Sequence, residues 1–179
     1  MKATLFLLPA LFSLVVITPE AAEINLAKAE TLGCISLDEI SNSNSPAEIF
    51  GALTLCMDKQ DYQSAAALYT VGTLYAVYDT KRVADESAHQ AISLLRMYAL
   101  SGRPEGALEQ LQAEVSELLT DNTEVCKDIL KRGKPTYRPT YMTEYSTAER
   151  TDSNPEPQLV EDFNEQEAWR DSLAIVPHC

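Results

Sequence analysis

Residues 59–69 read KQDYQSAAALY, and this stretch decides the fold that the sequence predicts. A turn-like break is followed by Tyr62, by the small residue Ala65, and by a second aromatic residue, Tyr69, at helical spacing. Gly72 continues the same pattern. Small residues on one helix let a neighbouring helix approach closely, while aromatic rings fill the groove on either side of the contact. The stretch therefore predicts the turn and the second helix of a helical hairpin.

The first helix of this hairpin has a clear start. Residues 45–48 read SPAE, a capping box with proline at the first helical position. We predict a first helix over 46–59, and Asp61 is placed to cap a second helix over 62–79. In both segments apolar and small residues recur with the helical period.

The pattern returns in a weaker form at residues 101–107, SGRPEGA, where Ala107 occupies the place of Ala65 but the aromatic residues are missing. Residues 49–72 resemble tetratricopeptide and Sel1-like repeats. This resemblance implies an all-α fold of antiparallel helical hairpins in a right-handed array. Two copies are fewer than a long solenoid needs, so we expect a repeat pair within one domain.

Caps and periodicity predict further helices after the hairpin. A third helix is expected over 83–101, with Gly102 placed to end it. Pro104 opens a fourth helix. Residues 121–124, DNTE, read as another capping box, which begins a short helix that stops at Gly133.

The C-terminal part has a different composition. Residues 134–141 read KPTYRPTY, which indicates an extended segment laid over the helices. We predict an irregular extension over 138–163, extended or mobile, and a short terminal helix over 164–174 that begins with the capping box NEQE. Residues 23–179 are thus expected to form a single domain.

The N-terminus has the pattern of a secretion signal. Met1-Lys2 is followed by an apolar run over 3–17 that is too short to span a bilayer comfortably. We predict a signal peptide over 1–22, cleaved near Ala22, and export to the periplasm. The alternative is a retained N-terminal anchor helix.

Four cysteines follow this segment, an even number that indicates two disulfides in an exported chain. Four cysteines allow three pairings. Cys34 and Cys56 enclose a short loop and flank the first hairpin, so we predict Cys34–Cys56. The second bridge is then Cys126–Cys179. The alternative for such a pair is two free, buried thiols.

The chain is strongly acidic, with 27 acidic and 14 basic residues and a formal net charge of −13. This charge disfavours binding to nucleic acid and to anionic membranes, and it favours basic partners. From Pro139 onward there are nine acidic and two basic residues. This acidic tail is either a solvated surface or an electrostatic plug for a basic cleft.

Residues that could perform catalysis are scarce. His89 and His178 are the two histidines, and neither has a second histidine or a cysteine at metal-ligand spacing on a shared face. A Cys–His nucleophile pair would need a free cysteine, which the two disulfides remove. We therefore predict no catalytic residues, no metal and no cofactor, and a hydrolase is the least favoured class.

Several short motifs together resemble a family of small exported bacterial proteins. The motifs are CI at 34–35, SP at 45–46, Tyr62 with Ala65, RVAD at 82–85, SAHQA at 87–91, KPTYRPTYM at 134–142, AW at 168–169 and HC at 178–179. This family is described as tetratricopeptide- or Sel1-like and is associated with immunity to phospholipase effectors of type VI secretion. The chain departs from the family pattern after Met142.

The resemblance implies a periplasmic immunity protein that occludes the active site of a secreted phospholipase with a basic cleft. Tyrosine suits binding faces as well as cores, and carboxylates suit a basic partner. The predicted partner-binding residues are Tyr78, Tyr137, Tyr141, Glu144, Glu161, Asp162 and Glu165. The alternative function is a periplasmic helical-repeat scaffold or assembly factor that holds peptide segments of envelope proteins in a tyrosine-lined groove.

Overall fold

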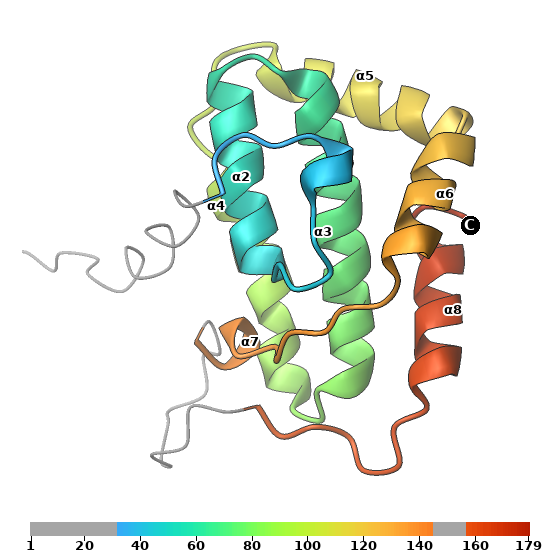
Figure 1. Cartoon of the computed structure of the whole chain (residues 1–179). Helices are drawn as coiled ribbons and strands as arrows, with labels where there is room; N and C mark the ends of the chain where they lie inside the picture. Colours follow the sequence, from blue (N-terminus) through green and yellow to red (C-terminus); the bar gives the residue numbers. More distant parts are fainter. Residues whose placement is uncertain (1–31, 145–156) are drawn as a thin grey trace, which may run out of the picture.

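The computed structural model describes residues 32–144 and 157–179. The predicted signal peptide over 1–22 and the central part of the predicted irregular extension lie outside the described residues. Within them the chain forms α-helices and two 3-10 turns and no strand, so the predicted all-α fold is confirmed (Figure 1). The elements are η1 (Leu37–Glu39), α2 (Pro46–Asp58), α3 (Tyr62–Arg82), η2 (Glu86–His89), α4 (Gln90–Leu100), α5 (Ala107–Thr120), α6 (Thr123–Arg132), α7 (Tyr141–Glu144) and α8 (Glu165–Ile175).

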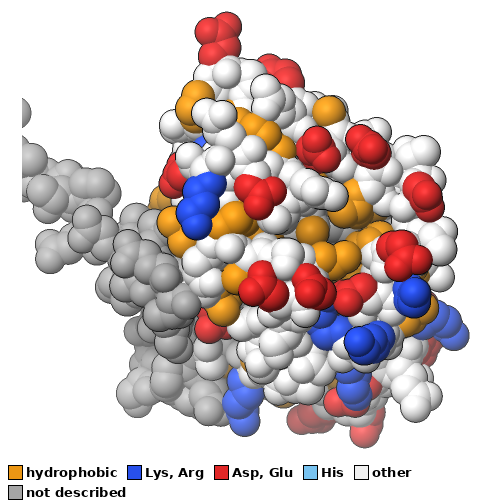
Figure 2. All heavy atoms as spheres, turned by 45° about the horizontal axis from the view of Figure 1, so that its top comes forward, with side chains coloured by type: hydrophobic (Ala, Val, Ile, Leu, Met, Phe, Trp, Pro, Cys, Tyr) orange, Lys and Arg blue, Asp and Glu red, His pale blue; other side chains and the backbone are white. Residues whose placement is uncertain are grey.

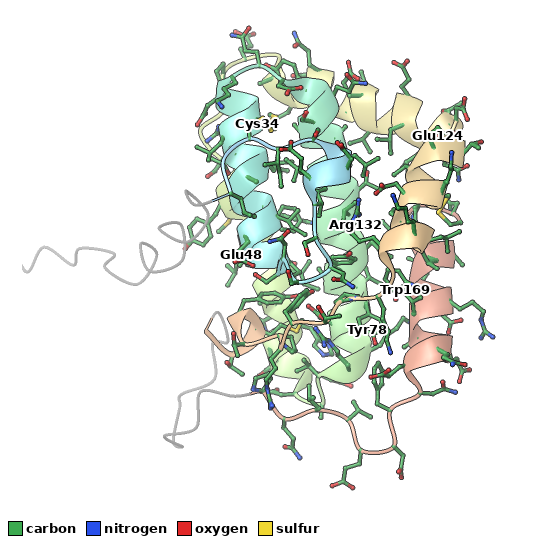
Figure 3. All side chains as sticks on the ribbon, viewed as in Figure 1. Cys34, Glu48, Tyr78, Glu124, Arg132 and Trp169 are labelled. Atoms are coloured by element: carbon green, nitrogen blue, oxygen red, sulfur yellow. A yellow bond between two sulfur atoms is a disulfide. The ribbon has the colours of Figure 1, made fainter. Side chains whose placement is uncertain are left out.

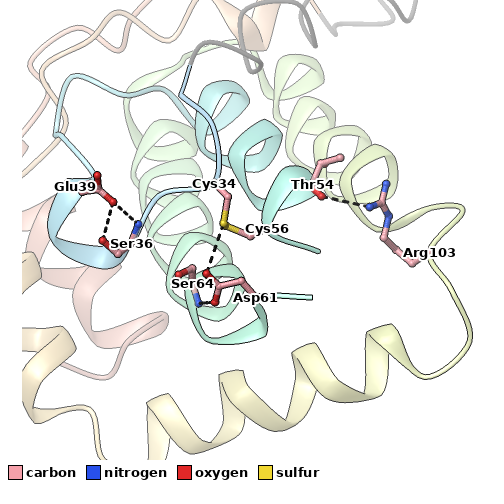
Figure 4. Close-up of a disulfide and its surroundings, with 8 residues drawn as sticks. All are labelled: Cys34, Ser36, Glu39, Thr54, Cys56, Asp61, Ser64 and Arg103. Atoms are coloured by element: carbon pink, nitrogen blue, oxygen red, sulfur yellow. Dashed lines mark hydrogen bonds between the residues drawn. A yellow bond between two sulfur atoms is a disulfide. The ribbon is translucent and has the colours of Figure 1, made fainter. Parts of the chain in front are cut away.

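The predicted hairpin is formed by α2 and α3. Ser45 caps α2 in a capping box in which its backbone N–H donates to the Glu48 carboxylate at 2.8 Å. The Asp61 side chain caps α3 by accepting a hydrogen bond from the Ser64 backbone N–H at 3.1 Å (Figure 4). The second helix is longer than predicted because it continues to Arg82, so Asp79 lies inside the helix and not at its end.

Gly72 marks the closest approach of α2 to α3. A Cβ atom at this position would lie 3.0 Å from Cγ2 of Ile49 and 3.4 Å from Cε2 of Phe50. Beside it the ring of Phe50 packs edge-on against Tyr69, with 6.2 Å between the ring centroids. The small residue and the aromatic ring therefore have the roles that the sequence pattern predicted for them.

Replacing Gly72 with valine should lower the free energy of unfolding by about 1–3 kcal/mol, because the added methyl groups overpack this buried contact. Ala113→Val, on the exposed side of α5, is the matched control and should change it by less than about 0.7 kcal/mol. Urea denaturation measures both. A Gly72 variant as stable as the control would show that the two helices do not need this close contact.

Three helices surround α3 on different sides: α2, α5 and α8 all pack against it, while α4 packs on α2. The core contains residues from all of these helices. The main packing partner of α5 is α3, and in the described residues α4 and α5 do not pack as extensively as α2 and α3 do. The repeat arrangement predicted from residues 101–107 is not confirmed.

Two other local predictions need correction. The predicted third helix over 83–101 begins with the 3-10 turn η2, where Asp85 caps the Ser87 backbone N–H, and α4 begins only at Gln90. The predicted capping box at 121–124 does not form. Asn122 is the N-cap of α6 but makes no side-chain cap hydrogen bond, because its amide donates instead to the carbonyl of Pro177 at 2.8 Å.

Both predicted disulfides are present. Cys34–Cys56 attaches the segment before η1 to α2, with the two Cα atoms 4.7 Å apart. Cys126–Cys179 attaches the last residue to α6, with a Cα separation of 5.6 Å. None of the described helices has the length and apolar character that crossing a membrane requires.

Candidate partner-binding site

A cleft of about 270 Å³ opens where η1, α3, α5 and α6 meet. Its apolar floor consists of Leu37, Ala66, Leu118 and Val125, one residue from each of these elements. We call it the acidic cleft because four carboxylates line it: Glu114, Glu117, Asp121 and Glu124.

The local structure explains why these side chains share one cleft. One side of α5 and its C-cap carries four of them, because positions three, four and seven residues after Glu114 lie on the same helix face. These positions are Glu117, Leu118 and Asp121. On the opposite wall, η1 is held in place because Arg132 of α6 donates to the carbonyl of Leu37 at 2.6 Å. The cleft is therefore built from fixed elements.

The acidic cleft lies in a part of the chain where negative charges greatly outnumber positive ones. Residues 104–126 contain six acidic residues and no lysine or arginine. Among the described residues, Glu124 is the cleft carboxylate with an ion-pair partner, Lys127 at 3.5 Å, and both side chains of that pair are exposed. The last turn of α5 also has no basic residue to offset the partial negative charge of its terminal carbonyls.

The surface around the cleft repeats this combination of charge and apolar area. Figure 2 turns the end of the molecule that carries α5 toward the viewer and shows acidic side chains with apolar ones between them, together with fewer Lys and Arg side chains, most of them toward the lower right of the view. Figure 3 shows Glu124 on the outer side of α6, away from the core. Such a surface is suited to a partner that is both basic and partly apolar.

Two of the predicted partner-binding tyrosines, Tyr78 and Tyr141, lie in the core of the folded chain. Tyr78 is 2% exposed and Tyr141 is 3% exposed. The ring of Tyr78 packs edge-on against Trp169 of α8, with 5.7 Å between centroids (Figure 3). Tyr137 is half-buried, and its ring lies against the Arg82 guanidinium, 5.0 Å from its centroid.

Two of these tyrosines donate hydrogen bonds to a buried carboxylate, that of Asp79. The hydroxyls of Tyr137 and Tyr141 each donate to Oδ2 of Asp79 at 2.8 Å. Nε of Arg82 donates to Oδ1 of Asp79 at 2.7 Å, and a guanidinium Nη of Arg82 donates to the Tyr137 carbonyl at 2.9 Å. This cluster attaches the segment after α6 to the end of α3, so its role is structural.

Burial raises the pKa of Asp79 to about 6, while Arg82 and the two tyrosine hydroxyls act in the opposite direction. Since this folded-state pKa lies above the ordinary value of 3.8, the folded state binds the proton more tightly than the unfolded state does. Below about pH 4 this tighter proton binding stabilises the folded state by about 3 kcal/mol. The stabilisation is lost as the pH rises through about 6.

Asp79→Asn removes this titration. We expect the difference in unfolding free energy between wild type and the variant to fall by about 3 kcal/mol from about pH 4 to pH 7. Urea denaturation across that range measures it. Asp162→Asn, at an exposed position with positive φ that asparagine tolerates, should show no such change. A difference that rises with pH would mean that the Arg82 pairing outweighs the burial of Asp79.

The predicted acidic residues of the C-terminal part do not line the cleft. Glu161 and Asp162 are exposed in the segment before α8. Glu165 forms an ion pair with Lys134. Glu144 is the last residue of α7, and its side chain lies outside the described residues. The structure therefore does not bring these four residues together with the acidic cleft.

One group of potential metal ligands occurs in the described part of the chain, formed by Cys34, Cys56 and Asp61. The two sulfurs are joined in a disulfide, so neither is available as a thiolate ligand. The histidines are bonded to backbone: Nε2 of His89 lies 3.0 Å from the Val83 carbonyl and Nδ1 of His178 lies 3.0 Å from the Ala174 carbonyl. These contacts are structural.

Sequence reasoning missed the four cleft carboxylates. The signal was present, because residues 104–126 contain no lysine or arginine and include a predicted helix with a continuous apolar stripe. Comparison with models of known protein families, with curated proteins and with solved structures found no match for this chain. The geometry and charge of the site are therefore the basis for a functional proposal.

Proposed function

We propose that this chain is an inhibitory binding protein of the immunity type, which engages a basic exported enzyme through the acidic cleft. The observation that carries this proposal is a cleft with an apolar floor and four carboxylates in a region without lysine or arginine. A basic partner would associate with such a surface quickly and in a salt-dependent manner. Binding at an enzyme's active-site cleft would then block access of its substrate.

The two disulfides support a role outside the reducing cytosol, since such bonds persist in oxidising compartments. They also preorganise the surface, because one holds the segment leading to η1 and the other holds α6, and both elements line the cleft. Preorganisation limits the entropy lost on binding. The resemblance to immunity proteins of type VI secretion adds the finer proposal, a periplasmic protein that protects against a phospholipase effector, whose cleft must attract phosphate.

The alternative scaffold function required a groove lined by tyrosines. Tyr75, Tyr78 and Tyr141 are buried, and the hydroxyls of Tyr137 and Tyr141 are used by Asp79. Among the described tyrosines, Tyr62, Tyr69 and Tyr137 are half-buried, and Tyr98 of α4 is 37% exposed. The packing therefore favours the inhibitor over the scaffold.

The proposal is tested by capture of partners with the oxidised, exported chain from proteins secreted by the same organism and its competitors, followed by calorimetry. We expect one dominant basic enzyme, bound one to one at nanomolar strength and more weakly as salt increases. Several weak partners with no salt dependence would contradict the proposal.

A further inference from the structure

We infer that the acidic cleft receives an arginine side chain that projects from the surface of the partner protein. This inference rests on the proposed function and specifies how the partner is recognised. It depends on the size of the cleft, the chemistry of its floor and the arrangement of its carboxylates.

The volume limits what can enter. About 270 Å³ is at or below the lower end of the range, roughly 300–1,000 Å³, that is typical of sites for small organic ligands. One long side chain fits a space of this size, whereas a lipid or a folded element does not. The occupant is therefore a single side chain presented by a larger partner that covers the surrounding surface.

The apolar floor and the carboxylates together favour a side chain that has an apolar stem and a positively charged end. Ala66 and Val125 are buried and Leu37 and Leu118 are half-buried, so the bottom of the cleft offers apolar contact. The carboxylates stand around it. Lysine and arginine have apolar stems and charged heads, and they alone match both parts of the cleft at once.

The arrangement of the carboxylates favours arginine over lysine. Glu114 and Glu117 come from α5, Asp121 from its C-cap and Glu124 from the start of α6, so the cleft offers carboxylate acceptors from two helices and the turn between them. A guanidinium offers five N–H donors in a planar fork and loses its hydration more readily than an ammonium group does. It can therefore pair with more than one carboxylate while its stem stays on the apolar floor.

The test uses N-acetyl-L-arginine amide as the probe and follows backbone amide signals of the oxidised chain by NMR. Saturable shifts are expected at residues 114–125 and at Leu37 and Ala66, with a dissociation constant in the millimolar range. The citrulline derivative, which has the same shape but no charge, should give no saturable shifts there. The lysine derivative should bind more weakly than the arginine probe.

Variants complete the test. Glu117→Gln combined with Asp121→Asn should weaken binding of the arginine probe at least about tenfold, because the charge-assisted hydrogen bonds are removed. Glu109→Gln, at an exposed position on α5 that does not line the cleft, should change it less than about twofold.

Three results would overturn the inference: no saturable shift, shifts spread equally over the exposed carboxylates of the molecule, or tighter binding of the lysine derivative. The proposed function is tested without this probe, by partner capture. A basic enzyme that is captured equally well by the Glu117→Gln, Asp121→Asn variant would leave the inhibitor function standing and remove the arginine-binding role of the cleft.

Discussion

Replacing both Cys126 and Cys179 with serine should lower the free energy of unfolding by about 4 kcal/mol. The disulfide joins residues 53 positions apart, and in the chain-entropy model a closed loop of this length stabilises the folded state by about that amount. The two positions suit the experiment because Cys126 is half-buried and Cys179 is exposed, so serine hydroxyls at both sites can reach water.

Urea denaturation of the oxidised proteins measures this effect. The double variant Cys34→Ser, Cys56→Ser gives a comparison, since its shorter loop predicts a chain-entropy loss of about 3 kcal/mol. Cys56 is fully buried, so burial of a serine hydroxyl adds to that loss. A decrease of less than about 1 kcal/mol for the Cys126 and Cys179 variant would show that other contacts, such as those of Asn122 with the C-terminal carbonyls, suffice to hold α8 and α6 together.

Reversing two charges in the acidic cleft should have a comparable effect on binding. Glu117→Lys with Asp121→Lys places two cations where the partner is expected to be basic. Each reversal replaces an attraction with a repulsion at close range, so the dissociation constant should rise roughly a thousandfold. Calorimetry or surface binding with the captured enzyme at a fixed salt concentration measures the change.

The matched control is Glu109→Lys with Glu86→Lys. It makes the same change in net charge at two exposed positions that do not line the cleft. Because solvent and salt screen exposed charges outside the contact, we expect less than about a tenfold change. Equal losses for the two double variants would show that total charge, and not the cleft, directs binding.

The helix boundaries were predictable wherever a local hydrogen bond determines them. Ser45, Asp61 and Asn164 each accept a hydrogen bond from a backbone N–H in the first turn of the helix that follows. These interactions need only the neighbouring residues, so the sequence pattern shows them. Gly72 was predictable for a similar reason, because a small residue at that helical spacing has value only when another helix lies against it.

The local predictions were wrong where a side chain forms hydrogen bonds with a distant part of the chain. Asn122 reads as part of a helix cap, yet its amide bonds to the carbonyls of Pro177 and His178. The sequence indicates that Asp79 is a polar residue at a helix end, yet it is completely buried and accepts hydrogen bonds from the hydroxyls of Tyr137 and Tyr141. No local sequence pattern shows that a tyrosine will donate a hydrogen bond to a carboxylate more than fifty positions away.

The acidic cleft was not predicted because it depends on how helices are brought together. Leu37, Ala66 and Val125 come from three separate elements, and their proximity follows from the packing of α5 on α3 and of α6 on η1. The sequence prediction placed the binding carboxylates in the C-terminal part, where negative charge is most abundant. The structure instead gathers carboxylates around an apolar floor, and such a floor is what permits a desolvated contact.

We propose that the chain silences a basic exported enzyme by covering its active site. The most direct test measures the rate at which the captured enzyme hydrolyses its substrate, phospholipid vesicles if it is a phospholipase, as the oxidised chain is added in increasing amounts. The account predicts that activity falls linearly to zero at one chain per enzyme, and that the Glu117→Lys, Asp121→Lys variant fails to inhibit at that ratio. Undiminished hydrolysis by an enzyme that is fully bound to the wild-type chain would contradict it.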